Sequence, residues 1–312
     1  MPGRQGSIRL FSYSGIDVFL HWSWFLIAMY EIRGGLGTYS SIGWNIAEYL
    51  ALFLIVTIHE FGHALACRQV GGFANRIVLW PMGGVAYVDP PPRPGATLWS
   101  IAAGPLVNVA LLPVLWIVVR ASRIAGLPAS QHDLFRLLQT IFYINFALLV
   151  FNILPIYPLD GGQILRSLLW FVMGRARSLM VATILGLLGV FGFIALAVVR
   201  GSLWLGAIAV FVLLNCWGGF QHARVLLRMA KLPRRAGYSC PTCNSAPPLG
   251  AYWKCNQCGQ AFDTFETGAA CPACRAQFPA TRCLDCGRQH SQHAWASPAL
   301  AGATELTSST AR

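Results

Sequence analysis

The stretch IAEYLALFLIVTIHEFGHALACRQV, residues 46–70, decides the fold of this chain. It is mostly apolar and long enough for a helix that crosses a bilayer, which needs about 20 residues. Near its middle, however, it carries His59, Glu60 and His63. An ionisable group at the centre of a membrane costs roughly 2.5 to 3.5 kcal/mol on insertion scales, so three such groups on neighbouring turns indicate a function rather than a plain anchor.

The composition of the whole chain agrees with a membrane protein. Hydrophobic residues make up 55% of the 312 residues and charged residues 11%, whereas soluble domains carry about a quarter charged residues. The mean hydropathy is +0.54, which excludes an ordinary soluble enzyme. We predict an α-helical polytopic membrane protein with about six transmembrane helices, at about residues 15–30, 46–70, 97–119, 134–154, 179–199 and 203–217. Residues 159–173 read as a continuation of the fourth helix.

The first predicted span also has features of a signal peptide, because Arg4 and Arg9 precede it. No small-residue cleavage site follows it, and His21 and Trp22 interrupt its apolar run. These features favour a retained first span over a cleaved signal.

The net charge of +12 is interpreted as a report on orientation, since Lys and Arg concentrate on the cytoplasmic side of membrane proteins. Six crossings would place both termini on one side. With that arrangement fewer basic residues lie outside than inside. Those outside are Arg33, Arg120, Arg123, Arg136 and Arg200. Those inside are Arg4, Arg9, Arg68, Arg76, Arg93, Arg166, Arg175, Arg177, Arg224, Arg228, Lys231, Arg234 and Arg235. We therefore expect a multi-pass protein of the cell (inner) membrane with cytoplasmic termini.

Two β-prone runs, residues 76–80 and 85–88, flank the turn signal Pro-Met-Gly-Gly and predict a short membrane-associated β-hairpin. The proline-rich residues 89–95 that follow predict a stiff loop. A free edge of the hairpin could bind an unwound substrate by strand addition. A proline at Leu79 or Ala86, whichever strand is free, would test this hypothesis.

The His59-Glu-Phe-Gly-His63 motif places two imidazoles one helical turn apart on the same face, which suits Zn²⁺. A catalytic zinc usually has three protein ligands and one open position. Glu60 lies beside the pair without being needed as a ligand, so its carboxylate is a candidate general base.

Asp160 is the candidate for the third ligand. It follows Pro155 and Pro158, which interrupt the fourth span, and irregular backbone at membrane depth is tolerated where it lines a cavity. Alone, Asp160 would be interpreted as the N-cap of a helix that begins near Gln163; the two histidines favour the ligand role instead.

Three asparagines within the spans have open roles. Asn152 could donate a hydrogen bond to a substrate carbonyl or to the developing oxyanion, or it could tie the broken helix to its neighbour. Asn108 and Asn145 are interpreted as helix-to-helix hydrogen bonds.

Three separated motifs together resemble the site-2 protease family of intramembrane zinc metalloproteases. They are His59-Glu60-x-x-His63, Ala103-Gly-Pro-Leu-Val-Asn108 and Asn152-x-x-Pro-x-x-Pro-Leu-Asp160-Gly, in the family's order over about residues 15–173. The resemblance implies a six-helix core, a catalytic zinc held by His59, His63 and Asp160, Glu60 as general base, and cleavage of membrane protein substrates in or near their transmembrane helix (regulated intramembrane proteolysis). Unlike many bacterial relatives, this sequence shows neither a PDZ domain nor a CBS pair.

Two other function classes remain at this point. A metal-ion transporter would also place histidines in a membrane helix, but it would not need a general base. A catalytically silent scaffold would only present the C-terminal region, and the complete ligand set argues against it.

The C-terminal region contains four Cys-x-x-Cys pairs, which predict two closed structural zinc sites and resemble a double zinc ribbon. Sequential pairing is preferred, and nesting of the inner two pairs within the outer two is the alternative. The pairs are Cys240 and Cys243, Cys255 and Cys258, Cys271 and Cys274, and Cys283 and Cys286.

Between Cys240 and Cys286 the basic residues are balanced by acidic ones, which argues against a nucleic-acid partner and favours a protein partner. The basic residues just before the ribbons are interpreted as anchors to anionic headgroups. The predicted domains are a transmembrane metalloprotease core at 1–235, the double zinc ribbon at 238–290 and a disordered tail at 291–312.

Overall fold

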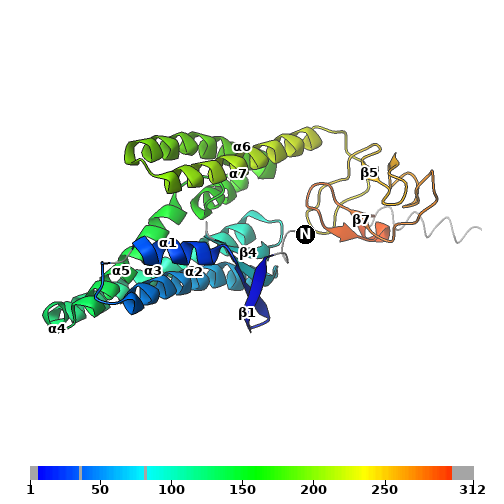
Figure 1. Cartoon of the computed structure of the whole chain (residues 1–312). Coiled ribbons are helices and arrows are strands. Elements are labelled where there is room, and N and C mark those ends of the chain that lie inside the picture. Colours follow the sequence, from blue (N-terminus) through cyan, green and yellow to red (C-terminus); the bar gives the residue numbers. More distant parts are fainter. Residues whose placement is uncertain (1–5, 35–36, 81–82, 297–312) are drawn as a thin grey trace, which may run out of the picture. The chain divides into compact units, whose positions relative to one another are not determined.

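The computed structural model describes residues 6–34, 37–80 and 83–296 (Figure 1). The chain divides into two compact units, Met1–Phe220 and Gln221–Arg312, which are treated separately. The first contains a β-sheet and the long apolar helices up to Phe220, and the second contains the end of the last helix and the cysteine pairs.

The sheet of the first unit has four strands in the order β1-β2-β3-β4. β1 (Ser7–Tyr13) and β2 (Ile16–His21) form one antiparallel hairpin, and β3 (Phe73–Trp80) and β4 (Gly83–Asp89) form another. β2 and β3 join the two hairpins in parallel. The predicted hairpin is thus confirmed, and it forms half of a larger sheet.

The prediction of a helix over residues 15–30 is wrong at its first half. Residues Ile16 to His21 form strand β2, because the run Ile-Asp-Val-Phe-Leu-His alternates and buries Ile16 and Val18 completely on one face. The helix that follows, α1, spans only Trp24–Gly34. Its 11 residues extend about 16 Å, too short to cross a bilayer core of about 30 Å without help.

Within the described residues, five helices are long and apolar enough to cross a membrane. They are α2 (Ile42–Gln69), α3 (Pro94–Ile124), α5 (His132–Ile153), α6 (Asp160–Arg200) and α7 (Leu203–Ala230). A single turn, α4 (Leu127–Ser130), connects α3 to α5. The helix α3 lies at the centre of this group, because it contacts α2, α5 and α6.

The prediction that residues 159–173 continue the fourth span is wrong. α5 ends at Ile153, and the turn that contains Pro155 and Pro158 separates it from α6. Each proline lacks the N–H that a continuing helix would need. α6 instead runs on to Arg200 through a break at Gly174, whose φ of 79° is non-helical. This turn places Asp160 at the very start of α6.

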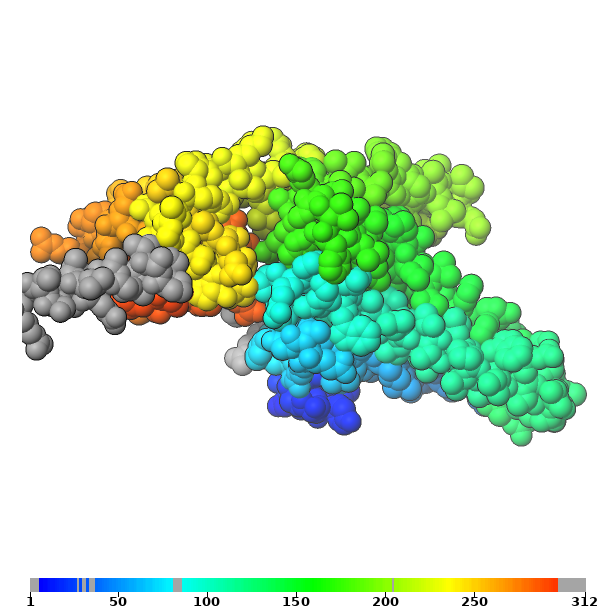
Figure 2. All heavy atoms as spheres, turned by 180° about the vertical axis from the view of Figure 1, so that it is seen from behind, coloured from blue at the N-terminus to red at the C-terminus, as the bar shows by residue number. Residues whose placement is uncertain are grey.

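The sheet packs against α2. Ile77 and Leu79 of β3 share a buried apolar cluster with Val56, Ala64 and other residues of α2. At the end of α2, the guanidinium of Arg68 donates to the carbonyls of Ser14, Gly15 and Ala74, which ties both hairpins to the helix. β1 is almost entirely exposed and lies at the surface of this unit, coloured blue in Figure 2.

The second unit is built from four similar cysteine turns. In each, the carbonyl of the first cysteine accepts a hydrogen bond from the fourth residue after it, which has positive φ. These fourth residues are Asn244, Gly259, Arg275 and Gly287. Two short hairpins complete the unit: β5 (Trp253–Lys254) with β6 (Ala261–Phe262), and β7 (Thr281–Arg282) with β8 (Gln289–His290).

The preferred sequential pairing of the cysteine turns is wrong, because the turns are nested. The first and fourth turns face each other, and so do the second and third. The hairpin β5–β6 encloses the second turn and the hairpin β7–β8 encloses the fourth, so each hairpin carries a turn of a different site.

The predicted tail also begins too early. Gln292–Trp295 form a 3₁₀-helix, and Trp295 is 1% exposed among Cys240, Cys283 and Phe265. Residues 291–296 therefore belong to the folded unit, and residues 297–312 lie outside the described part of the chain.

Two of the predicted headgroup anchors have acidic partners within the second unit. Arg234 forms two bonds to the carboxylate of Asp285, at 2.6 and 3.1 Å, and also donates to the carbonyl of Met229. Arg235 pairs with the buried Asp263 at 2.7 Å. These two side chains connect the end of α7 to the cysteine turns.

Candidate metal centres

His59, His63 and Asp160 meet in the interior of the first unit. The Nε2 atoms of the two histidines are 3.1 Å apart, and Oδ2 of Asp160 lies 3.0 Å from Nε2 of His59 and 3.3 Å from Nε2 of His63. The two histidines come from one face of α2, one turn apart, and Asp160 comes from the first residue of α6. The structure thus brings all three predicted ligands together.

These distances fit a metal site. Two ligand atoms about 2.0–2.1 Å from one tetrahedral zinc ion lie about 3.3 Å apart, close to the three measured separations. Two imidazole nitrogens and a carboxylate oxygen facing one another are also a donor set that zinc accepts. The residues present therefore fit a zinc ion with three protein ligands.

The other nitrogen of each imidazole is bonded within the protein. Nδ1 of His59 lies 2.5 Å from Oδ1 of Asn108, and Nδ1 of His63 lies 2.9 Å from the backbone oxygen of Ser100. Both partners are on α3. Because both oxygens are acceptors, each Nδ1 carries the proton and each Nε2 presents its lone pair to the site.

Gly104 allows α3 to approach the two histidines. A Cβ atom at this position would lie 2.2 Å from Nε2 of His63 and 2.8 Å from Nε2 of His59. Only glycine fits without displacing the ligand atoms.

Glu60 lies beside the ligand residues and is 6% exposed. Its Oε2 accepts a hydrogen bond of 2.8 Å from the backbone N–H of Ala86, in β4. The strand β4 is one of the two outer strands of the sheet, whereas Leu79 lies in β3, which pairs on both sides. Of the two proposed proline positions only Ala86 is therefore on an outer strand, and its N–H is already engaged by Glu60.

Asn152, the candidate for oxyanion binding, is half-buried near the end of α5. Among the residues that the structure describes, the hydrogen bonds of the three ligands lead to Asn108 and Ser100 and not to Asn152. The importance of Ser100 was not visible in the sequence, because it acts through its backbone oxygen.

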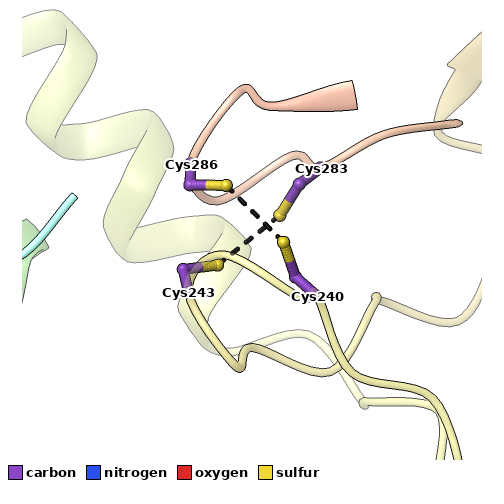
Figure 3. A group of neighbouring side chains, drawn as sticks. All are labelled: Cys240, Cys243, Cys283 and Cys286. Atoms are coloured by element: carbon purple, nitrogen blue, oxygen red, sulfur yellow. Dashed lines mark hydrogen bonds between the residues drawn. The ribbon is translucent and has the colours of Figure 1, made fainter. Parts of the chain in front are cut away.

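The second unit holds two further ligand clusters. In the outer cluster, Sγ of Cys240 lies 3.7 Å from Sγ of Cys286, and Sγ of Cys243 lies 3.8 Å from Sγ of Cys283 (Figure 3). In the inner cluster, Cys255 lies 3.5 Å from Cys274, and Cys258 lies 3.6 Å from Cys271. Sulfurs about 2.3 Å from one tetrahedral zinc ion lie about 3.8 Å apart, so both clusters are compatible with structural zinc.

One thiol of the inner cluster, that of Cys255, is biased toward the thiolate. The backbone N–H of Cys258, with a smaller contribution from that of Gln257, lowers the pKa of Cys255 to about 6. Hydrogen bonds to the charged form stabilise it, and the thiolate is the form that binds metal.

The comparison with known proteins assigns the helical part of the chain. A family model described as peptidase family M50 matches residues 47–125 and 123–196, which include all three ligands and Glu60. The membrane core of this chain belongs to peptidase family M50. Its fold is similar to a solved site-2 protease from Methanocaldococcus jannaschii, with a TM-score of 0.50 and 28% identity, over 69% of this chain and 95% of that one.

Curated relatives of this M50 chain include a zinc metalloprotease of Methanocaldococcus jannaschii, 36% identical over 58% of this chain and 50% of the relative. Another is stage IV sporulation protein FB of Bacillus subtilis, 34% identical over 39% of this chain and 40% of the relative. The chain thus spans about half the length of the curated relatives it matches.

Proposed function

We propose that this protein is an intramembrane zinc metalloprotease that hydrolyses peptide bonds in or near the transmembrane segment of membrane proteins. One observation carries the proposal: three ligand atoms from α2 and α6 converge beside a buried carboxylate, within helices apolar enough to cross a membrane. Membership of peptidase family M50 supports it.

In this proposal His59, His63 and Asp160 hold the metal. Zinc supplies Lewis-acid chemistry at such a site, because it polarises a carbonyl and makes water more acidic. Glu60 takes the proton from the attacking water and returns it to the leaving amine. The N–H of Ala86 holds one oxygen of Glu60, which leaves the other for the proton. Asn152 remains a candidate for contact with the substrate carbonyl.

A transport function is less well supported by this geometry. A transported ion would benefit from every nearby carboxylate as a ligand, yet one oxygen of Glu60 is held by the backbone of β4. Hydrogen bonds from Nδ1 of the two imidazoles to Asn108 and Ser100 fix the orientation of both rings, which suits a resident ion.

The cysteine clusters would hold two structural zinc ions, and we propose that the ribbons bind a protein partner. Asp263 and Asp285, which balance the basic residues of this region, are themselves paired with Arg235 and Arg234. The proposal rests on the equal numbers of basic and acidic residues between Cys240 and Cys286, which argue against a partner with a phosphate backbone.

Substitution of Glu60 tests the proteolytic function. Glu60→Gln is expected to keep the core zinc, because Glu60 is not a ligand, and to lower cleavage by a factor of about 10² to 10⁴. Asp160→Ala is expected to lower zinc occupancy. Cleavage products are compared by membrane proteomics of cells carrying the intact or the Glu60→Gln protein, and metal content is measured on purified protein. Native cleavage by Glu60→Gln would exclude this mechanism.

A further inference from the structure

We propose that Asn108 and Asn145 are positioning residues that fix the proton of His59 on Nδ1, so that Nε2 is always free for the metal. The inference rests on the proposed metal site and concerns the side of His59 that faces away from it. Its basis is a chain of hydrogen bonds that begins at a backbone oxygen and ends at the imidazole.

The two asparagines link α3 to α5 beneath His59. Oδ1 of Asn108 lies 2.5 Å from Nδ1 of His59, and Nδ2 of Asn108 donates to Oδ1 of Asn145 at 2.8 Å. Nδ2 of Asn145 in turn donates to the backbone oxygen of Asn108 at 3.0 Å. Both side chains are 0% exposed, so water does not replace a missing partner.

The direction of every bond in this chain follows from its first member. A backbone oxygen can only accept, so Asn145 must turn its NH₂ group toward it and its Oδ1 toward Asn108. Asn108 must then donate with its own NH₂ group and present Oδ1 to His59. An accepting oxygen at Nδ1 requires the proton there and leaves the lone pair on Nε2.

Asn108 alone could not enforce this orientation. An amide has a donor end and an acceptor end of nearly the same shape. A flipped Asn108 would turn its NH₂ group toward Nδ1 of His59 and would donate a hydrogen bond to it instead of accepting one. Nδ1 would then lose its proton to Nε2, where it would block the metal. Asn145 prevents the flip, because a flipped Asn108 would point its oxygen at the oxygen of Asn145.

The simpler alternative is that the pair only joins two helices, as the sequence pattern suggested. The two explanations differ in which substitutions of Asn108 they allow. A carboxylate at position 108 accepts through either oxygen and needs no orientation, whereas a helix-joining role needs the NH₂ group of Asn108.

The experiment measures zinc affinity, not cleavage, in the full-length protein in detergent, by competition with a chromophoric chelator. His59→Ala defines the signal that comes from the cysteine clusters. Asn108→Leu, which keeps the branched shape but has neither donor nor acceptor, is expected to lower the affinity of the core site by about 10- to 100-fold. Asn108→Asp is expected to keep zinc affinity near that of the parent, because it keeps an acceptor toward Nδ1 of His59. Its second oxygen meets Oδ1 of Asn145, so Asn145 must turn its NH₂ group toward it, which lowers stability but leaves the proton of His59 on Nδ1.

The deciding comparison is Asn145→Leu in two backgrounds. With Asn108 present it is expected to lower zinc affinity, and with Asn108→Asp it is expected to have no further effect, because a carboxylate has no wrong orientation. Helicity and size-exclusion profiles identify variants that have not folded, and the two-background comparison still decides if Asn108→Leu does not fold.

The positioning role of the two asparagines (the relay) is overturned if Asn108→Asp loses as much zinc affinity as Asn108→Leu. It is also overturned if Asn145→Leu lowers zinc affinity equally in both backgrounds. If instead the parent and His59→Ala bind zinc identically, it is the proposed metal site that fails, before the relay is tested.

Discussion

At the scale of single residues, the metal centre combines local spacing with distant support. His59 and His63 are placed by one turn of one helix, and Asp160 joins them across about 100 positions of sequence. The ligands were predictable because few residue types bind zinc and few of those lie in apolar segments. Their supports are an amide, a backbone oxygen and a glycine, which have many other uses in a helix.

Gly104 gives a prediction at this scale. Gly104→Ala should abolish zinc binding by the core, since the new methyl group would overlap Nε2 of His63. Metal analysis of purified protein measures the effect. Gly192→Ala is the matched control, because a Cβ at that helical position meets no atom within 4 Å and should leave zinc unchanged. Normal zinc content in Gly104→Ala would show that α3 can move away without harm.

Asn108 and Asn145 illustrate where sequence reasoning ended. Their hydrogen bonds between helices were predicted and are confirmed. The contact of Asn108 with His59 was not predicted, because it depends on the rotation of α3 about its axis, and that rotation is set by packing against three other helices.

At the scale of elements, the hairpin was predictable and the sheet was not. The alternating apolar pattern and the turn residues of β3 and β4 are local signals. The parallel pairing of β2 with β3 joins segments separated by the whole of α2, and no local pattern reports it. The same strand β2 was mistaken for part of a helix because its apolar residues continue without interruption into α1.

The outer strand β4 gives the second prediction. An unwound substrate needs partners for its backbone groups, and β4 offers an edge next to Glu60. A photoreactive benzoylphenylalanine in place of Tyr87, which is 44% exposed on β4, should cross-link to substrate in the Glu60→Gln background. Mass spectrometry of the cross-linked peptides should show contacts at every second substrate residue.

The opposite edge of the sheet provides the control for this experiment. Tyr13 on β1 is 64% exposed, and the same photoreactive group there should capture little substrate. Equal cross-linking at both edges would contradict strand addition to β4. Ala86→Pro is a poorer test, because it also removes the hydrogen bond to Glu60.

The cysteine turns give a third prediction. In the nested arrangement Cys240 and Cys283 belong to one site, so the double variant Cys240→Ser, Cys283→Ser should lose one zinc ion per chain. Sequential pairing would place them in two sites, and the same variant would lose two. The double variant Cys240→Ser, Cys255→Ser reverses these expectations and serves as the control. Zinc per chain is measured by elemental analysis.

At the scale of the whole molecule, six crossings are expected, whereas the described residues contain five helices long enough to cross a membrane; the difference lies in the N-terminal segment. The charge pattern predicts that both termini are cytoplasmic, which requires an even number of crossings. Five crossings by the five long helices alone would place the termini on opposite sides.

Sidedness is therefore a prediction that can be measured directly. Reporter enzymes fused to each end should both show a cytoplasmic location. This result requires an even number of crossings, so either the N-terminal segment with α1 or one part of α6 must change the count from the five long helices. An N-terminus outside the cytoplasm with a cytoplasmic C-terminus would show that β1 and β2 lie on the outer side of the membrane. A fusion after Ala296 leaves the cysteine turns intact, because Trp295 is the last buried residue described.

The nesting of the cysteine turns has a consequence for biosynthesis. Cys258 and Cys271, in the inner site, are 13 residues apart, whereas Cys243 and Cys283, in the outer site, are 40 apart. Closing the longer loop from a disordered chain costs about 1 kcal/mol more. The ligand set of the inner site is also complete first, because its last member is Cys274 and that of the outer site is Cys286. The inner ion can therefore bind while the chain is still being made, and it shortens the loop that the outer ion must close. Because Trp295 covers the outer site, that site is finished only when synthesis has passed residue 295. A chain truncated earlier would leave the ribosome with thiols exposed, in a form that proteases of the cell can distinguish from the finished protein.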